Sequence, residues 1–252
     1  MMETIKRAVR KTPLGPYAAM TYSVVRGQGV KGVLYDMQTQ QVFRRVLRSD
    51  SSCLDVGAHK GVILEDMLKL APLGRHIAFE PLPDYAEGLR RRFPQVTVVE
   101  AAVADQPGTS EFVYVRSDPA YSGLRERMYD NLHPTLDKIN VRVTTIDAEV
   151  PPDANIALMK VDIEGGEYHA LLGALETIRR CRPVIVFEAS ARSTGLYGVE
   201  PEQMHGLLTQ ELGYRLSTMK RWLAGGPPME AAELRRHWHE DSEYYYIAYP
   251  TS

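Results

Sequence analysis

The chain has 252 residues, of which 44% are apolar and 25% are charged. This is ordinary for a globular protein, and the chain is long enough to bury a core without disulfides or structural metals. Its net charge of −2 at pH 7 gives no overall electrostatic footprint for duplex nucleic acid. No apolar run approaches the roughly 18 residues of a membrane span, and no apolar signal segment follows the basic N-terminus. The composition therefore predicts a cytoplasmic protein with no nucleic-acid partner and no stable membrane insertion.

The first 50 residues are more basic than the rest, with nine Lys and Arg residues against three Asp and Glu residues. They are expected to form an N-terminal helical extension, residues 1–50, ahead of a single domain over residues 51–252. The basic residues fit either a solvated helix or a docking surface for an acidic carrier or an anionic lipid. We expect the first 35 residues to pack over the mouth of the domain's site. The sequence does not indicate an oligomeric state.

From residue 51 on, short strand-like runs alternate with amphipathic helical stretches. The predicted strands are Ser52–Val56, His76–Glu80, Val96–Val103, Ile156–Asp162, Val184–Glu188, Tyr214–Thr218 and Tyr244–Tyr249. The predicted helices are Gly61–Leu70, Tyr85–Phe93, Glu167–Arg179 and, after a GGPP turn, the later part of Ala224–Trp238. Strands that alternate with helices form right-handed βαβ units, which predicts an α/β fold with a mostly parallel sheet.

The middle of the chain departs from this alternation. Ser110–Val115 and Val141–Ile146 alternate like half-buried strands, and the segment between them, Arg116–Asn140, is long and polar with intermittent aromatic residues. A connection of this length in a compact domain is usually functional or disordered. We expect a lid or substrate loop with a turn at Ser122–Leu124, in which His133 is either a general base or a solvated loop residue.

The stretch Ser51–Gly61, SSCLDVGAHKG, is the most informative one. Its apolar run ends at Asp55, a loop with Gly57 and Gly61 follows, and a second apolar run ends at Glu80. Parallel α/β sheets build nucleoside sites in this way, because the glycines allow a sharp turn and close approach, and the second acid accepts hydrogen bonds from ribose hydroxyls. The loop lacks the additional glycine that admits a dinucleotide pyrophosphate. Its spacing therefore favours a cofactor without phosphates, of which S-adenosylmethionine is the common one.

One further segment and one residue of the loop extend this cofactor site. In EAAVAD, residues 100–105, small side chains leave room for a flat adenine ring, and Ala102 is expected to offer a backbone N–H to a ring nitrogen. His59 is either a cofactor contact or a solvent-facing loop residue. The residues assigned to the cofactor are Asp55, Gly57, Ala58, His59, Gly61, Glu80, Pro81, Ala102 and Asp162.

The densest chemistry lies in Met159–Tyr168, MKVDIEGGEY. Asp162 ends a strand and Glu164 opens the next helix, and ligands of open α/β sheets bind at the carboxyl ends of strands. Both acids are therefore candidate catalytic residues together with His133, unless Glu164 and Glu167 only favour the helix N-terminus through the helix dipole. A divalent metal on Asp162, Glu164 and Glu188 is conceivable, because hard cations take carboxylate oxygens. No His or Cys cluster accompanies these acids, and we predict no metal site.

Seven separated blocks resemble, in their order, the FkbM family of S-adenosylmethionine-dependent methyltransferases. The blocks are DVGAHKG, FEPLP, EAAVAD, YSGL, VRVTTID, MKVDIEGGEYHALLGA and PVIVFEAS, and they span over half of the chain. The resemblance implies a class I methyltransferase fold. This fold is a Rossmann-like three-layer sandwich with a seven-stranded sheet in the order 3-2-1-4-5-7-6, in which strand seven is antiparallel.

The resemblance also implies roles for particular residues. Glu80 would hold the ribose, Asp162 and Glu164 would stand at the active-site rim, and the cofactor loop would consist of Asp55, Gly57 and Gly61. His59 departs from the family, which usually has Asn at this position, and this leaves the side-chain contacts of the loop open.

Together these interpretations predict an O-methyltransferase that acts on a hydroxyl of a small molecule, such as a sugar, a glycolipid or a polyketide-type natural product. The hydroxyl would attack the sulfonium methyl in line, with Asp162, Glu164 or His133 taking its proton. Two rivals stay open, a nicotinamide-dependent oxidoreductase of Rossmann type and a non-catalytic binding module of the same fold. A nucleic-acid methyltransferase is disfavoured by the net charge of −2.

Overall fold

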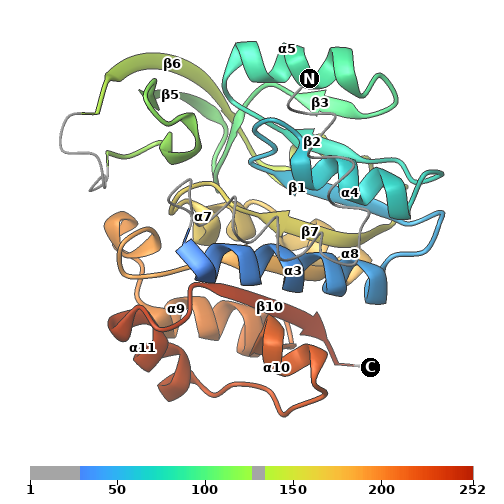
Figure 1. The fold of residues 1–252 in the computed structure, drawn as a ribbon, viewed down its shortest axis with the longest axis vertical. Helices are drawn as coiled ribbons and strands as arrows, with labels where there is room; N and C mark the ends of the chain where they lie inside the picture. The colour runs from blue at the N-terminus through green and yellow to red at the C-terminus, as the bar shows by residue number, and fades with distance from the viewer. Residues whose placement is uncertain (1–28, 127–133, 252) are drawn as a thin grey trace.

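The computed structural model describes residues 29–126 and 134–251, which form a three-layer α/β sandwich (Figure 1). Seven strands make the central sheet in the spatial order β3-β2-β1-β7-β8-β10-β9. All neighbours are parallel except β10, which runs antiparallel to both β8 and β9. Counted along this sheet alone, the order is 3-2-1-4-5-7-6, so the predicted topology is confirmed.

The strands of this sheet begin and end close to where the sequence predicts. Their bounds are β1 Ser52–Val56, β2 Ile77–Phe79, β3 Thr97–Val99, β7 Ile156–Val161, β8 Val184–Glu188, β9 Tyr214–Thr218 and β10 Tyr245–Pro250. A parallel strand with helices on both faces needs apolar residues on both of its sides, and β7 (IALMKV) follows this rule except at Lys160.

Helices cover both faces of the sheet. One face carries α3 Gly29–Val46, α4 Val62–Leu70, α5 Pro83–Arg92 and α10 Met219–Leu223. The opposite face carries α6 Ile146–Glu149, α7 Glu167–Leu172, α8 Leu175–Cys181, α9 Pro201–Gly206 and α11 Ala231–Glu240. None of the described helices is long and apolar enough to cross a membrane.

Helix α3 is the described part of the basic N-terminal region. It packs on the sheet through Tyr35, Val42 and Phe43, which belong to the same apolar cluster as Met219 of α10 and Ile247 of β10. Residues 1–28, which the sequence places over the mouth of the site, lie outside the described residues.

The predicted helix Glu167–Arg179 is in fact two helices, α7 and α8. The chain breaks at Gly173, where an added Cβ would lie 2.2 Å from the Ala104 carbonyl oxygen. Beyond the break, the Asp147 carboxylate accepts hydrogen bonds of 3.0 and 2.8 Å from two backbone amides of the first turn of α8. The prediction of one continuous helix was therefore wrong, because a close approach and a cap from another segment interrupt it.

A second sheet of three strands stands beside the central one, at the upper left of Figure 1. It has the order β4-β6-β5, with bounds β4 Ala102–Val103, β5 Gly108–Val115 and β6 Leu136–Thr144. The sequence predicted one strand over Val96–Val103, and this was wrong. The chain turns at Ala101, whose N–H donates to the Val99 carbonyl at 3.1 Å, so the second half of the run joins a different sheet.

The connection between β5 and β6 is shorter than the predicted loop Arg116–Asn140, because β6 already begins at Leu136. Its first part folds back on β5, since Gly123 and Val113 exchange backbone hydrogen bonds of 2.9 and 3.2 Å. The Ser122 hydroxyl also accepts a hydrogen bond of 3.0 Å from a backbone N–H of β5. The chain therefore turns within residues 116–121, earlier than the turn expected at Ser122–Leu124, because Gly123 already pairs with β5. His133 lies in the segment 127–133, outside the described residues.

Candidate active site

A cavity of about 320 Å³ opens at the carboxyl edge of the central sheet, where β1, β2 and β7 end. Its other walls come from the second sheet, from residues 119–124, and from Asp36 of α3 and Tyr197. The sequence candidates that line it are Gly57, Ala58, His59, Glu80, Pro81, Ala102, Asp162 and Glu164. A volume of this size is typical of a small-molecule site.

The loop after β1 owes its course to two glycines with left-handed backbones. Gly57 has φ 87°, and an added Cβ would lie 2.0 Å from the Asp162 carbonyl oxygen, so only glycine lets the loop approach the end of β7. Gly61 has φ 73°, and its Cβ would lie 2.6 Å from the Leu89 side chain of α5. Gly61 does not line the cavity. Its role is structural, because the missing side chain allows the start of α4 to lie close to α5.

Glu80 follows β2 and is held from both sides by the backbone. Its Oε2 accepts a hydrogen bond of 2.7 Å from the His59 N–H, and its Oε1 accepts one of 3.0 Å from the Leu82 N–H. The side chain is 4% exposed, and burial raises its pKa to about 7, although the two N–H donors work in the opposite direction. The carboxyl group therefore has a fixed plane at the cavity wall, and it titrates near neutral pH.

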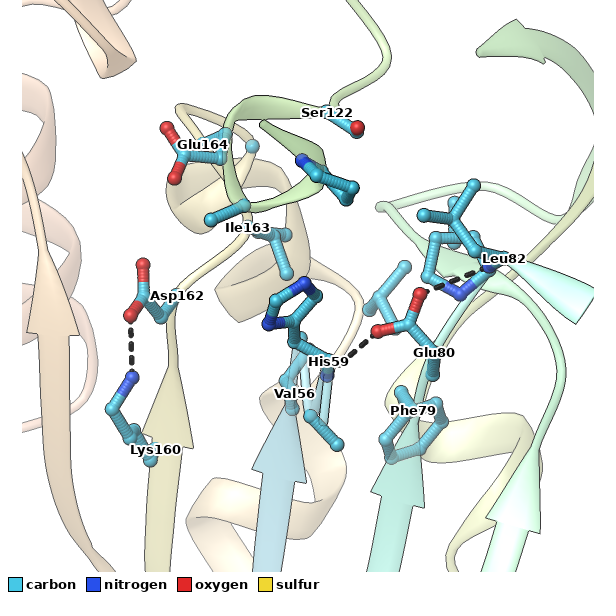
Figure 2. A pocket seen from close by; sticks show the side chains of 18 of the residues that line it. Val56, His59, Phe79, Glu80, Leu82, Ser122, Lys160, Asp162, Ile163 and Glu164 are labelled. Carbon is cyan, nitrogen blue, oxygen red and sulfur yellow. Dashed lines mark hydrogen bonds and ion pairs between the residues drawn. The ribbon is translucent and has the colours of Figure 1, made fainter. Parts of the chain in front are cut away.

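His59 occupies the middle of the crevice, between Glu80 and Asp162 (Figure 2). Its backbone is left-handed with φ 47°, and its ring contacts the Tyr85 ring with 4.6 Å between centroids. The Nε2 atom is buried and has no hydrogen-bond partner among the described residues. Burial lowers the pKa of the ring, and the Lys60 charge adds to this effect. The neutral imidazole is thus placed to contact a ligand.

Asp55 lies below the cavity and does not line it. Its side chain is 1% exposed, and neither carboxylate oxygen has a hydrogen-bond partner among the described residues. Asp55 pairs in register with Lys160 on β7. Burial raises the pKa of Asp55 to about 6, although the Lys160 charge lowers it. The structure therefore makes Asp55 a buried acid beneath the loop.

Asp162 is bound by two residues that the sequence analysis missed. Its Oδ2 receives Lys160 Nζ at 2.6 Å and Tyr245 Oη at 2.5 Å. Burial would raise the pKa of Asp162, but the Lys160 ammonium, these two hydrogen bonds and a hydrogen bond with the neighbouring Glu188 carboxyl group hold it below its usual value. A signal for Lys160 was present in the sequence, as a lone charge in an apolar strand two residues before Asp162, on the same strand face. Tyr245 gave no such signal, because it lies 83 residues away.

Glu164 and Glu167 separate into two roles. Glu167 is fully buried, and its Oε1 accepts hydrogen bonds from the Ile163 and Gly165 amides at 2.9 and 3.2 Å. Glu164 lines the cavity from a left-handed backbone with φ 61°, a conformation that costs free energy for a residue with a side chain. The reading that the acids only support the helix start therefore fits Glu167, whereas Glu164 faces the cavity.

Three carboxylates gather at this end of the cavity. Asp162, Glu164 and Glu188 each offer an oxygen within 4.8 Å of the others. The positive charge beside them comes from Lys160, whose ammonium already binds Asp162 Oδ2 at 2.6 Å. The cluster by itself does not define a metal site.

The central sheet has the fold of class I methyltransferases, and the cavity at its carboxyl edge has a glycine-shaped loop after β1 and an acid after β2. Residues 55–216 match the methyltransferase FkbM domain, which is more than half of the chain. The chain belongs to the FkbM methyltransferase family, as its sequence blocks predicted. Membership implies a cofactor of the S-adenosylmethionine type.

Solved structures share this fold at low sequence identity. Methyltransferase FkbM from Methylobacillus flagellatus is 19% identical with a TM-score of 0.50, over 81% of this chain and 44% of that one. A TehB-like SAM-dependent methyltransferase from Corynebacterium glutamicum is 12% identical with a TM-score of 0.46, over 96% and 100%. A putative rRNA methylase from Clostridium thermocellum is 8% identical with a TM-score of 0.45, over 85% and 95%.

Identities this low show the fold alone, and the chain spans less than half of the length of the first of these structures. No curated protein matches the chain. The substrate must therefore be argued from the cavity itself.

Proposed function

We propose that this protein is an S-adenosylmethionine-dependent O-methyltransferase that acts on a hydroxyl of a small molecule, such as a sugar, a glycolipid or a polyketide-type natural product. The observation that carries the proposal is the arrangement of the acids in one cavity. Glu80 stands on one side, and Asp162 and Glu164 stand on the other, with His59 between them (Figure 2). One acid can thus serve a nucleoside while the other two serve a reacting group.

The residues present fit the proposed cofactor. The left-handed Gly57 keeps the loop backbone open, and the two amides that hold Glu80 turn its carboxylate into a fixed acceptor for ribose hydroxyls. Leu82, Ala102 and Phe112 line the cavity beside Glu80 and belong to one apolar cluster, which suits an adenine ring. When bound, S-adenosylmethionine supplies an electrophilic methyl group on a positively charged sulfur.

Besides the cofactor, the reaction requires a base for the hydroxyl that receives the methyl group. An alcohol has a high pKa, so a base must take its proton as the new bond forms. Asp162 and Glu164 both line the cavity, and Asp162 stays ionised at neutral pH because of Lys160. We propose that one of these two acids is the base. His133 remains a candidate from the sequence alone.

The wall opposite the strand ends fits a molecule with both apolar faces and hydroxyls. Pro119, Ala120 and Leu124 give it apolar surface, while Tyr197 and Asp36 add polar groups. Sugars and polyketides combine the same two kinds of surface. This mixture supports a small hydroxylated acceptor.

Binding measurements test the cofactor. We expect S-adenosylhomocysteine to bind in the micromolar range and NADH not to bind, as measured by isothermal titration calorimetry. Free ligand at about 100 times its dissociation constant should stabilise the fold by about 2.7 kcal/mol in thermal unfolding. No heat and no melting shift with either sulfur compound would contradict the proposal, and binding of NADH would favour the oxidoreductase.

Transfer of a labelled methyl group tests the acceptor. The wild-type protein is incubated with methyl-labelled S-adenosylmethionine and a panel of free sugars, glycosides, glycolipids and macrolide alcohols, with ribosomal RNA as a separate arm. Label in a small hydroxyl compound supports the proposal, whereas label in RNA alone contradicts it. Cofactor binding without transfer to any acceptor would favour the non-catalytic module. The same assay in EDTA, with and without added Mg²⁺, tests for a required exchangeable metal.

A further inference from the structure

Four neighbouring strands place polar side chains in one row, on the sheet face that α3 covers. Asp55 of β1 pairs in register with Lys160 of β7, and Glu188 of β8 pairs in register with Tyr245 of β10. One step further from the cavity on the same face, each strand carries an apolar residue of one buried cluster, namely Cys53, Leu158, Val186 and, on the antiparallel β10, Ile247. The row therefore lies at the boundary between the apolar core and the cavity.

Burial makes this row energetically demanding unless its charges are paired. Lys160 is 5% exposed, yet its pKa is raised, because attraction to Asp162 and Asp55 outweighs its desolvation. The lysine is therefore an ammonium ion. Its Nζ donates a hydrogen bond of 2.6 Å to Asp162 Oδ2.

The two oxygens of Asp162 face different surroundings. Oδ2 accepts from both Lys160 Nζ and Tyr245 Oη, at 2.6 and 2.5 Å. Oδ1 points away from Lys160, toward Glu164 at the cavity (Figure 2). Glu188 is the third carboxyl group of this cluster, and it also hydrogen-bonds to Asp162. Two donors from two strands fix the plane of the carboxylate, because rotation of the side chain would break both hydrogen bonds at once.

We propose that Lys160 and Tyr245 are positioning residues that bind Asp162 Oδ2 and thereby hold Oδ1, with its negative charge, toward the reacting centre. The proposal rests on the proposed methyl transfer, since it assigns Asp162 to the place of the transferable methyl. Lys160 and Tyr245 act through Asp162 and not on the acceptor. The ammonium ion and the phenol thus do for Asp162 what backbone amides do for Glu80.

The role of Tyr245 can be tested through ligand binding alone. S-adenosylhomocysteine lacks the transferable methyl, and sinefungin carries an amine at that position. A carboxylate oxygen held at the methyl position should favour sinefungin. Replacing Tyr245→Phe should reduce this preference by about tenfold, the scale of one charge-assisted hydrogen bond. The affinity for S-adenosylhomocysteine should change by less than about twofold, as for a site without shared partners.

Tyr246→Phe is the matched control. Tyr246 is the next residue of β10 and faces the opposite side of the sheet, where its hydroxyl donates to the Glu243 carbonyl at 2.9 Å. This variant also loses a part-buried tyrosine hydrogen bond of the same strand, but one that does not involve Asp162, so the sinefungin preference should stay at the wild-type value. If Tyr245→Phe does not fold, Lys160→Arg provides the same reading, because it keeps the charge but changes the geometry.

The expected results distinguish a failure of the positioning role from a failure of the proposed function. Loss of the sinefungin preference in Tyr245→Phe but not in Tyr246→Phe, with a lower kcat and an unchanged KM for S-adenosylmethionine, supports positioning. An unchanged preference and an unchanged kcat in Tyr245→Phe overturn it, even in a protein that transfers methyl groups. If neither analogue binds the wild-type protein, the proposed function is wrong and the positioning role falls with it.

Discussion

The cavity has two walls that are built in different ways. One wall is formed by the ends of the buried parallel strands, and it carries both Glu80 and Asp162, which nearby donors fix. On the other side, the wall combines the small second sheet and residues 119–124 with Asp36 of α3, which are distant in the sequence. Strand ends suit groups that must keep one geometry, whereas added segments can vary without disturbing the sheet. We therefore propose that the first wall, the strand side, carries the chemistry and that the second, the acceptor side, selects the acceptor.

The largest effect is expected from Asp162→Asn. Turnover should fall by about 10²–10⁴-fold, the usual contribution of a general base, or by less if Glu164 is the base. The structure adds a cost that the sequence did not suggest, because Lys160 would lose its charged partner. Removing one member of a buried pair costs about 3–5 kcal/mol in the free energy of unfolding. Labelled methyl transfer and denaturant unfolding measure the two effects.

A double variant separates stability from chemistry at this position. Asp162→Asn combined with Lys160→Met removes both charges, so it should recover much of the free energy of unfolding without recovering turnover. Recovery of turnover in the double variant would mean that Asp162 serves only to neutralise Lys160.

The next largest effect is expected from Glu80, the strand-end acid that we assign to the cofactor. Glu80→Ala should weaken S-adenosylhomocysteine binding by about 100-fold, because charge-assisted hydrogen bonds contribute about 1.5–3 kcal/mol each. Titration calorimetry measures this loss. Glu100→Ala is a suitable control, because Glu100 is a half-exposed acid of an ion pair with Arg90 and does not line the cavity. Binding by Glu80→Ala at the wild-type level would show that the ribose lies elsewhere.

A smaller effect follows from the pKa of Glu80, which burial raises to about 7. Ribose hydroxyls bind the ionised form, which dominates at pH 8 and becomes the minority form at pH 6. The affinity for S-adenosylhomocysteine should therefore fall by about tenfold between these two pH values. Glu80→Gln does not titrate, so its weaker binding should be nearly constant over this range. A wild-type affinity that does not change with pH would show that Glu80 already is ionised at pH 6.

The smallest effect is expected on the acceptor side. Asp36→Asn should raise the KM of the acceptor by about threefold, the scale of one exposed polar contact, and leave cofactor affinity unchanged. Competition between acceptors of the panel, measured for wild type and variant, shows whether their ranking changes. A change in S-adenosylhomocysteine affinity instead would show that Asp36 contacts the cofactor, and it would contradict the assignment of Asp36 to the acceptor side.

The sequence predicted the strand side well because its signals are local. β1, β8 and β9 have the predicted bounds, and Glu80, Asp162 and Glu164 line the cavity as expected. Each of these acids stands at or just after the end of an apolar run. Strand ends in a parallel sheet meet at one edge, so spacing along the chain is enough to bring them together.

The acceptor side and the supports of Asp162 could not be predicted in the same way. Tyr245 reaches Asp162 only because β10 inserts next to β8, and Asp36 reaches the cavity only through the packing of α3. The second sheet depends on a turn at Ala101 within a run that looks like one strand. Such features depend on contacts between distant segments, which local patterns do not encode.

The place of β10 in the sheet has a consequence for the order of folding. It is the last of the described strands in sequence, yet it lies between β8 and β9, which are made earlier. Until Tyr245–Pro250 is available, β8 has an unpaired edge and β9 has no partner among the described strands, and open edges can pair with other chains. A nascent chain that has not yet added this strand therefore has both an aggregation risk and an Asp162 without its phenol donor. Completion of the sheet and completion of the proposed reaction centre thus depend on the same strand, β10.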